Sequence, residues 1–265
     1  MDLGIEGRTA LVFGGDSGIG WHTARRLLDE GAVVVVSDLD QERLDAAAAR
    51  LEAPAGRLHA FAADVTDLGS LAALRERIEE ATGPVDILVQ SSGITGAQGL
   101  FHEIDDAGWT TTIETDLMGP VRIVTTFLPH LRRGWGRLVL LASEDAVQPY
   151  DDEIPYCAAK AGVLALMKGL SRTYAKEGLT VNAVSPAFIR TPMTDAMMTR
   201  SSEEQGISFD EAVERMLTEK RPFMAIKRRG EPDEVAAVIA FLVSAGASFV
   251  NGANYRVDAG SVGSI

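Results

Sequence analysis

The sequence predicts the α/β fold class, as a single Rossmann-like domain with a doubly wound parallel sheet of seven strands and helices on both faces. The first observation is that short β-branched runs alternate with longer stretches of helical periodicity almost to the end of the chain, which is typical of βαβ units. The second is that several short runs, such as residues 33–36 and 138–141, are apolar throughout. Parallel strands that are covered on both faces have this composition.

The predicted elements follow one another in a regular order. The segments expected to be strands are residues 9–13, 32–37, 58–63, 87–91, 138–142, 180–185 and 254–257. The segments expected to be helices are residues 19–30, 41–51, 68–81, 105–131, 155–177 and 232–244. The chain has no linker rich in Pro, Gly or Ser, no repeat and no low-complexity tract, which indicates one domain over residues 1–265.

One stretch, residues 192–232, interrupts this alternation. It has no strand pattern and is rich in Met and in charged residues. An insertion of this length between regular units is usually functional or mobile. We therefore interpret residues 192–232 as a lid over the substrate site. The simpler alternative is a pair of surface helices, and a lid can itself be such a pair.

The composition is that of an ordinary globular protein with an acidic surface. Apolar residues make up 46% and charged residues 24% of the 265 residues, and the formal net charge is −13. Such a chain is expected to repel nucleic acid and anionic membranes, which leaves a small-molecule substrate as its partner. One cysteine cannot form a disulfide within the chain, and the longest apolar run, residues 235–243, is far shorter than the roughly 20 residues of a bilayer span. With no signal-peptide pattern at residues 1–7, we expect a soluble, cytoplasmic protein.

A glycine-rich turn, Gly-Gly-Asp-Ser-Gly-Ile-Gly at positions 14–20, lies between the first predicted strand and the first predicted helix. Its glycines permit a tight turn and a close approach of the backbone to a pyrophosphate, while the helix N-terminus supplies free N–H groups to the anion. A glycine triplet is a weak signal alone, but its place in the first βα turn strengthens it. The candidate cofactor-binding residues of the turn are Gly14, Asp16, Ser17, Gly18, Ile19 and Gly20.

Asp38 ends the second predicted strand, 20 residues after Gly18. An acidic residue at this distance binds the ribose hydroxyls of a dinucleotide, and its carboxylate repels a 2′-phosphate. No Arg or Lys follows before Arg43. Asp38 and its neighbour Leu39 therefore predict NAD(H) rather than NADP(H). The alternative is that Asp38 is only a turn residue, with Asp40 as the cap of the next helix.

Tyr156 and Lys160 stand four residues apart at the start of a strong helical pattern, so the phenol and the ammonium share one face of the helix. A nearby ammonium is expected to lower the pKa of a tyrosine from about 10 toward the working pH. Such a tyrosine can act as a general acid or base on an alcohol or carbonyl oxygen. The pair is common by itself, but Ser143 follows a predicted strand thirteen residues before Tyr156. Together the three residues predict a catalytic site.

These motifs resemble those of the short-chain dehydrogenase/reductase family along nearly the whole chain. Besides the glycine-rich turn, Ser143, Tyr156 and Lys160, the matching segments are Asp-Val at 64–65, Leu-Val-Gln-Ser-Ser-Gly at 88–93, Val-Asn-Ala-Val-Ser-Pro at 181–186 and Val-Asp-Ala-Gly at 257–260. Each motif is weak, but their order and spacing together are specific. The resemblance implies one Rossmann-like domain, an NAD(P)-dependent oxidoreductase and usually a homotetramer.

The resemblance also implies roles for individual residues. Tyr156 would be the general acid/base, Ser143 would hold the substrate oxygen, and Lys160 would bind the nicotinamide ribose and lower the tyrosine pKa. The Asp64 carboxylate would meet the adenine, with Val65 beside it. The other residues implied for the cofactor are Ser91, Ser92, Gly93, Pro186, Ile189 and Thr191, the last two at the nicotinamide carboxamide.

Four features of the sequence depart from the family pattern. Phe13 replaces a Thr whose hydroxyl braces the glycine-rich turn, and Ala187 replaces a Gly. Gln-Ser-Ser-Gly at 90–93 replaces Asn-Asn-Ala-Gly, so Gln or Ser must remake the hydrogen bonds on the cofactor side. Asp116 stands where the family commonly has an Asn that completes a proton relay, partly through its backbone. We therefore name Asp116 as a further catalytic candidate; the alternative is that it only marks a helix kink.

Several other polar side chains are assigned to structural roles. Cys157 follows Tyr156 directly, but the next position on a helix points elsewhere, so we expect a small buried thiol. Glu144 and Asp145 are expected to be loop carboxylates in water, with contact to a polar substrate as the alternative. Residues 151–153 are expected to form a solvated turn, and the basic run 227–229 is also expected to be solvated. The four His residues show no metal-ligand spacing, so no metal is expected.

Together these features predict an NAD(H)-dependent oxidoreductase that acts on a secondary alcohol/ketone pair. The alternative among enzymes is a reductase of 3-oxoacyl thioesters on acyl carrier protein or CoA, which shares these motifs. The acidic surface argues against an acidic carrier protein. A third alternative is a non-catalytic NAD-binding sensor, although such proteins typically lose the Tyr or the Lys.

Overall fold

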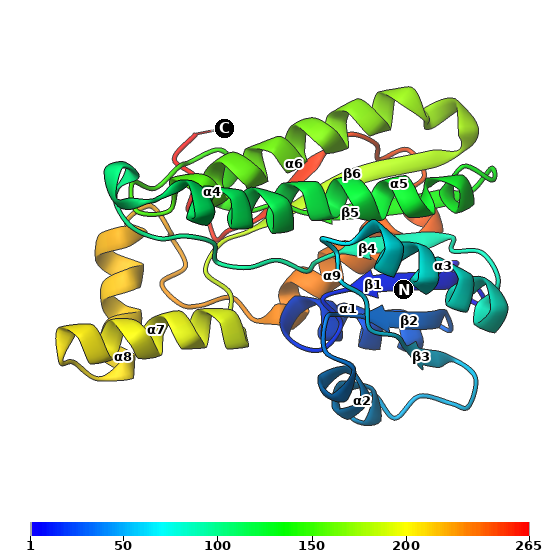
Figure 1. Cartoon of the computed structure of the whole chain (residues 1–265), viewed down its shortest axis with the longest axis horizontal. Helices are drawn as coiled ribbons and strands as arrows, with labels where there is room; N and C mark the ends of the chain where they lie inside the picture. Colours follow the sequence, from blue (N-terminus) through cyan, green and yellow to red (C-terminus); the bar gives the residue numbers. More distant parts are fainter. Residues whose placement is uncertain (1, 265) are drawn as a thin grey trace.

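The computed structural model describes residues 2–264, and its central feature is one seven-stranded sheet in which all neighbouring strands run parallel (Figure 1). The strand order is β3-β2-β1-β4-β5-β6-β7. The strands are β1 (Thr9–Phe13), β2 (Val33–Ser37), β3 (Leu58–Ala60), β4 (Ile87–Gln90), β5 (Gly136–Leu141), β6 (Leu179–Pro186) and β7 (Asn254–Val257). The predicted fold class, a Rossmann-like α/β fold with seven parallel strands, is confirmed.

The strands differ from the prediction only at their ends. β3 is shorter than the predicted strand over residues 58–63, because beyond Ala60 the N–H groups of Phe61 and Ala63 bond the β2 side without forming a regular ladder. β3 is an edge strand and pairs with β2 alone. β5 begins two residues earlier than predicted, since the Gly136 N–H already donates to the Gly178 carbonyl oxygen (3.1 Å).

Helices connect the strands and cover both faces of the sheet. They are α1 (Gly18–Asp29), α2 (Gln41–Ala49), α3 (Leu68–Thr82), α4 (Asp106–Ile113), α5 (Gly119–Leu131), α6 (Ile154–Thr173), α7 (Pro192–Gln205), α8 (Phe209–Arg215) and α9 (Pro232–Leu242). The predicted helix over residues 155–177 is shorter, because a separate 3₁₀ turn, Ala175–Glu177, follows α6. Within residues 2–264, no helix combines the length and the apolar character that crossing a membrane requires.

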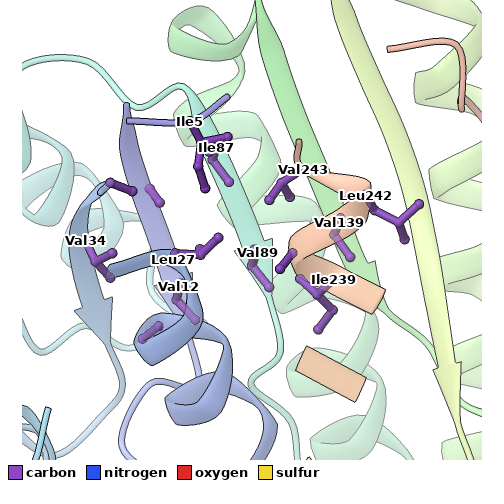
Figure 2. Close-up of a cluster of buried hydrophobic side chains, with 14 of the residues drawn as sticks. Ile5, Val12, Leu27, Val34, Ile87, Val89, Val139, Ile239, Leu242 and Val243 are labelled. Carbon is purple, nitrogen blue, oxygen red and sulfur yellow. The ribbon is translucent and has the colours of Figure 1, made fainter. Parts of the chain in front are cut away.

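Each face of the sheet has its own apolar core. On one face, Leu27 of α1 and Ile239 of α9 pack against strand residues such as Val12 and Val89 (Figure 2). On the other face, α3, α5 and α6 pack around a cluster that includes Phe13. Because successive residues of a strand point to opposite faces, a sheet buried on both sides needs strands that are apolar throughout. This requirement explains the continuous apolar runs in the sequence.

The prediction of one helix over residues 105–131 is wrong. α4 and α5 are joined there by a π-helical turn, Glu114–Met118, which widens the helix locally. The π turn leaves the side chain of Asp116 completely buried. Such turns often occur at functional sites. The smooth helical periodicity of this stretch gives no sign of the widened turn.

The segment of residues 192–232 consists of α7, α8 and a second π turn, Met216–Lys220. Its only strand-like pairing in the described chain is an isolated bridge from Gly230 to Ile189. α7 and α8 stand out at one end of the molecule, in yellow (Figure 1). They have a small core of their own, which includes Met198 and Met224. The expected pair of helices is therefore present, beyond the carboxyl end of β6.

We predict that Leu27→Ala lowers the free energy of unfolding by about 2–5 kcal/mol, because Leu27 is fully buried between α1 and the sheet. Leu68→Ala is the matched control: this leucine is exposed at the start of α3, and its truncation should cost less than about 0.5 kcal/mol. Chemical denaturation of the two variants measures both values. Equal losses would contradict the packing described for this face.

Candidate active site

The strand order reverses between β1 and β4, and a cavity of about 230 Å³ is lined by the loops that follow these two strands. In an open α/β sheet, ligands bind at this switch point, outside the carboxyl ends of the strands. The predicted site residues that line the cavity are Gly14, Asp16, Ser17, Gly18, Ile19, Gly20, Asp38, Ser91, Ser92, Gly93, Ser143, Tyr156, Lys160, Pro186, Ile189 and Thr191. The fold thus brings the glycine-rich turn and the Ser143 region to one cavity.

Only glycine fits at two positions of the glycine-rich turn. Gly14 has a φ of +78°, and a Cβ there would lie 2.8 Å from backbone atoms of both Ser91 and Ser92. A Cβ on Gly20 would lie 2.1 Å from the Gly14 carbonyl oxygen. The turn, the start of α1 and the end of β4 are therefore in direct backbone contact.

The N-terminus of α1 fits an anionic group. The residue before it, Ser17, makes no side-chain cap hydrogen bond in the described structure; its hydroxyl donates to Asp16 Oδ1 (2.8 Å) instead. The N–H groups of the first helical turn therefore have no side-chain acceptor of this kind, and Gly18 and Ile19 line the cavity. Uncapped N–H groups at a helix N-terminus are suited to bind the phosphates of a dinucleotide.

Ser91 takes over the bracing role that Phe13 cannot perform. The Ser91 hydroxyl donates to the carbonyl oxygen of Phe13, the last residue before the glycine-rich turn. Gln90 in turn holds the following loop, since its Nε2 donates to the Ser92 carbonyl oxygen (2.7 Å) and to the Ser92 hydroxyl (3.2 Å). These bonds hold the β4 loop and the turn in place, while the hydrogen bonds that Gln or Ser is expected to remake on the cofactor side stay a prediction.

The electrostatic surroundings of Asp38 are acidic. Its Oδ1 accepts a hydrogen bond from the Leu39 N–H (2.7 Å). Burial raises the pKa of Asp38, the Leu39 N–H opposes this rise, and the nearby Asp16 carboxylate adds to it. Arg43, the nearest base in the following sequence, is paired with Asp16 at 2.5 Å. Asp38 therefore lies near a second carboxylate, that of Asp16, which is itself paired with Arg43.

Ser143, Tyr156 and Lys160 are held by β5 and α6. Ser143 lies two residues beyond β5, where its Oγ accepts from the Asp145 N–H (3.3 Å) at the start of a 3₁₀ turn. Lys160 Nζ lies 5.4 Å from the centre of the Tyr156 ring. It also donates to the carbonyl oxygen of Leu141 at the end of β5 (3.3 Å), which fixes the ammonium between sheet and helix.

The expectation that the pKa of Tyr156 is lowered toward the working pH is wrong for the protein alone. Burial raises the pKa of Tyr156 well above 10, and the carboxylates of Asp145 and Asp116 add to this rise; a hydrogen bond with Ser143 opposes it. Lys160 is not the only charge near the phenol, because the fold also surrounds it with acids that lie far from it in the sequence or on the neighbouring loop. Tyr156 is therefore protonated at ordinary pH, which is the form that a general acid requires.

Asp116 lies behind the cavity wall rather than in it. Its Oδ1 accepts from the Ile94 N–H (3.0 Å), while its Oδ2 has no hydrogen-bond partner in the described part of the chain. Burial raises the pKa of Asp116, and the Lys160 ammonium opposes the rise. A Cβ on Gly93 would lie 2.7 Å from Asp116 Oδ1 and 3.5 Å from Lys160 Nζ. Gly93 therefore leaves room for this acid beside the ammonium.

Three predicted cofactor residues, Leu39, Asp64 and Val65, are not among the residues that line this cavity. Leu39 is 68% exposed, and Asp64 Oδ1 accepts from both the N–H and the hydroxyl of Thr66 in a local turn (2.8 and 2.7 Å). The lining residues that sequence reasoning missed are Ile94, Leu141, Ala142, Ala187, Pro192, Met193 and Thr194. The one sign in the sequence that these residues line the cavity is that each lies next to, or close to, a predicted site residue.

The expectation that Glu144 and Asp145 are loop carboxylates in water is wrong. Both are buried and face Arg221, which belongs to the 192–232 segment. Glu153, expected in a solvated turn, is also largely buried and points to the same arginine. Arg229, from a run expected to be solvated, is buried and pairs with Asp195 (2.7 Å). The partners lie far apart in the sequence, which is why local patterns did not reveal them.

Other reactive groups in the described chain do not add to this site. Cys157 is buried as expected, and burial raises the pKa of its thiol to about 11, which makes it a poor nucleophile. Among the side chains of residues 2–264, no group of three or more His, Cys, Asp or Glu residues is arranged to hold a metal ion.

Comparison with known proteins identifies the class of this site. A family model described as enoyl-(acyl carrier protein) reductase, a model of short-chain dehydrogenases/reductases, matches residues 14–261. The chain is 38% identical to cis-4-hydroxycyclohexanecarboxylate dehydrogenase of Sinomonas cyclohexanicum, over 96% of both chains. It is 33% identical to meso-2,3-butanediol dehydrogenase of Serratia marcescens, over 98% of this chain and 96% of that one.

A solved structure gives the same result for the fold. The L-sorbose reductase of Gluconobacter frateurii, in complex with NADPH and L-sorbose, has a TM-score of 0.92 and is 30% identical over the whole of both chains. The fold and the matches define an oxidoreductase with a nicotinamide cofactor that acts on hydroxyl or carbonyl groups. The chain belongs to the short-chain dehydrogenase/reductase family. The resemblance seen in the sequence motifs is thereby confirmed.

We predict that Ser91→Ala weakens NADH binding about threefold to tenfold, because loss of the hydroxyl removes one hydrogen bond from the base of the glycine-rich turn. Fluorescence titration measures the Kd. Thr125→Ala is the matched control, since its hydroxyl also bonds a backbone carbonyl oxygen (that of Val121, 2.8 Å), but on the exposed side of α5. An unchanged Kd in Ser91→Ala would mean that the turn does not need this brace.

Proposed function

We propose that the protein is an NAD(H)-dependent oxidoreductase that transfers hydride between the nicotinamide and a secondary alcohol/ketone substrate through Ser143, Tyr156 and Lys160. The observation that carries this proposal is that these three side chains line the same cavity as the glycine-rich turn and Asp38. Family membership supports the general reaction, and the geometry of the cavity supports the assignment of residues.

The residues that line the cavity can be assigned to the successive parts of a dinucleotide. The glycine-rich turn and the uncapped start of α1 would hold the pyrophosphate, and Asp38 would bind the adenosine ribose hydroxyls. Lys160 would bind the nicotinamide ribose, with Ile189 and Thr191 at the carboxamide. When bound, the nicotinamide supplies the acceptor or donor of hydride. We keep Asp64 and Val65 as adenine neighbours in this proposal, although they lie outside the lining.

The chain's own residues would move the proton and stabilise the reacting oxygen. In the reduction direction, Tyr156 gives its phenolic proton to the carbonyl oxygen as the carbonyl carbon gains a hydride, and the alcohol is formed. In the oxidation direction, the phenol first gives up its proton through the relay, and the phenolate oxygen of Tyr156 then accepts the hydroxyl proton of the alcohol. Ser143 donates a hydrogen bond to the oxygen on which charge develops. Lys160 and the adjacent Asp116 would return the proton to Tyr156 through a relay behind the cavity wall.

The preference for NAD(H) rests on the acids around the ribose position. Asp38 and Asp16 are both at the cavity, and Arg43 is paired with Asp16. The sorbose reductase structure contains NADPH, so NADP(H) use occurs on this fold and the choice between the two cofactors depends on the charges near the ribose.

We also propose a cytoplasmic homotetramer of single-domain subunits with residues 192–232 as the lid. The exposed side chains of Phe241, on α9, and of Phe249, in the segment between α9 and the edge strand β7, support an interface on this part of the surface.

We predict that Tyr156→Phe lowers kcat by about 10²–10⁴-fold, because the proton donor and acceptor is lost while the ring stays in place. NADH binding should remain within about twofold of the native value. Tyr174→Phe, just beyond the other end of the same helix, is the control and should keep its activity. Initial rates with the best alcohol substrate give the comparison. Native turnover in Tyr156→Phe would refute the assigned role.

We predict that Asp38→Ala combined with Leu39→Arg shifts the ratio of the NADPH and NADH dissociation constants at least about tenfold toward NADPH, because a repelling carboxylate is replaced by a cation. Binding titrations measure this without any substrate. Asp45→Ala with Ala49→Arg makes the same change in net charge on the exposed side of α2 and should leave the ratio unchanged. An unchanged ratio in the Asp38 variant would place the ribose elsewhere.

A further inference from the structure

A buried ion cluster connects the 192–232 segment to the loop that carries Ser143. Arg221 follows the π turn Met216–Lys220, and its side chain is only 9% exposed. Its Nη1 forms an ion pair with Glu144 Oε1 (2.5 Å) and approaches Asp145 Oδ1 (3.4 Å); its Nη2 lies 3.9 Å from Glu153 Oε1. The guanidinium of Arg221 thus faces three carboxylates of residues that lie close to Ser143 or Tyr156 in the sequence. We refer to these four residues as the Arg221 cluster.

The Arg221 cluster stands between two cavities. Ser143 and Tyr156 line the 230 Å³ cavity at the switch point, and Asp145 contacts Ser143 through its backbone N–H. Arg221 and Glu153 line a second cavity, of about 530 Å³, under α7 and α8. The arginine therefore links a wall of the catalytic cavity to the 192–232 segment.

The backbone and the ring of Tyr150 hold the arginine in place. The Arg221 N–H donates to the Met216 carbonyl oxygen (3.0 Å), and the Met224 N–H donates to the Arg221 carbonyl oxygen (3.1 Å). The guanidinium carbon lies 4.4 Å from the centre of the Tyr150 ring. A planar guanidinium that stacks on an aromatic ring and faces several carboxylates is well suited to a buried position. These contacts orient the side chain; among the described residues, its Nε and both carboxylate oxygens of Glu144 have no hydrogen-bond partner, so the Glu144 contact is an ion pair.

We propose that Arg221 is a positioning residue of the reaction: it fastens the 192–232 segment to the Ser143 loop and neutralises the carboxylates beside Ser143. The proposal rests on the proposed function, since it concerns the same catalytic cavity. Three carboxylates that face one another in a buried space repel each other, and removal of Arg221 takes away the one cation that faces all three. Without Arg221, the charged loop would push the segment away and displace Ser143.

The pKa values of the carboxylates in the cluster set the pH range in which they need Arg221 as a counter-ion. Burial raises the pKa of Glu144 to about 7, an increase that Arg221 opposes; burial raises the pKa of Glu153 to about 7, with Asp145 adding to the rise. Ser261 and Asp258 also face Glu144, and Lys160 faces Asp145. Because Arg221 holds both pKa values down, its removal raises them further; without it the glutamates are protonated near pH 6 and become charged only as the pH rises well above 7. The need for Arg221 therefore increases as the pH rises.

The test is the pH dependence of kcat and KM in Arg221→Met. We expect kcat/KM to fall at least about tenfold near pH 9 but no more than about threefold near pH 6, chiefly through KM, with NADH binding unchanged. Arg221→Lys keeps the cation and should restore kcat/KM to within about threefold of the native value. Arg221→Met with Glu144→Gln should recover part of the loss near pH 9, because one uncompensated charge is gone.

Lys220→Met is the matched control. Lys220 is the adjacent residue and also pairs with an acid, Asp152 (3.1 Å), but its side chain is 56% exposed, so its removal should change kcat/KM less than about twofold at either pH. A loss in Arg221→Met that is equal at both pH values, or no rescue by Lys, would overturn the proposal and leave a purely structural role. If native protein turns over no alcohol or ketone, the proposed function fails instead.

If Arg221→Met does not fold, the comparison of Arg221→Lys with the double variant Arg221→Met/Glu144→Gln carries the test. Replacement of both partners of a buried ion pair is often tolerated, so the double variant is expected to fold. Near pH 9 the proposal predicts a KM near native for Arg221→Lys and a KM about threefold to tenfold higher for the double variant, because Asp145 and Glu153 are left there without the guanidinium. Equal KM values in the two variants would overturn it.

Discussion

The rest of the structure depends on the close contact between the turn after β1 and the end of β4. Gly14 and Gly20 touch the neighbouring backbone so closely that any Cβ would collide, and the Ser91 hydroxyl bonds the carbonyl oxygen just before the turn. This contact brings the start of α1 to the edge of the sheet at the point where the strand order reverses. The helix N-terminus, the acid at the end of β2 and the β4 loop then share one cavity.

The other side of the cavity is governed by a balance of buried charges. Tyr156 lies among Asp116, Asp145 and Glu153, with the ammonium of Lys160 near its ring. Burial, with the acids adding to its effect, raises the pKa of Tyr156, so the phenol is protonated in the protein alone, which is the form that a general acid requires. Arg221, which belongs to the 192–232 segment, offsets the negative charge of Glu144 and Asp145 in this region. Its position explains how a loop with several acids can border a catalytic tyrosine.

The sequence predicted what depends on short-range patterns. The continuous apolar runs predicted a parallel sheet, and the glycine spacing placed the turn correctly after the first strand. Asp38 lines the cavity as expected because it ends β2 beside β1. The residues that the structure alone reveals depend on contacts between distant segments. Glu144 meets Arg221 only through the folding of the 192–232 segment, and the π turn at Asp116 leaves the helical periodicity unchanged.

The central claim is that this cavity carries out nicotinamide-dependent oxidation and reduction of an alcohol/ketone pair, with NAD(H) preferred. It is tested most directly by initial rates with NAD and NADP against secondary alcohols, polyols, sugars, hydroxysteroids and 3-hydroxyacyl thioesters, and by the reverse reactions with NADH and NADPH. The account predicts turnover of at least one alcohol/ketone pair, with a higher kcat/KM for the NAD couple. NADH binding without turnover of any member of the panel would contradict it, and a higher kcat/KM with the NADP couple would contradict the role given to Asp38.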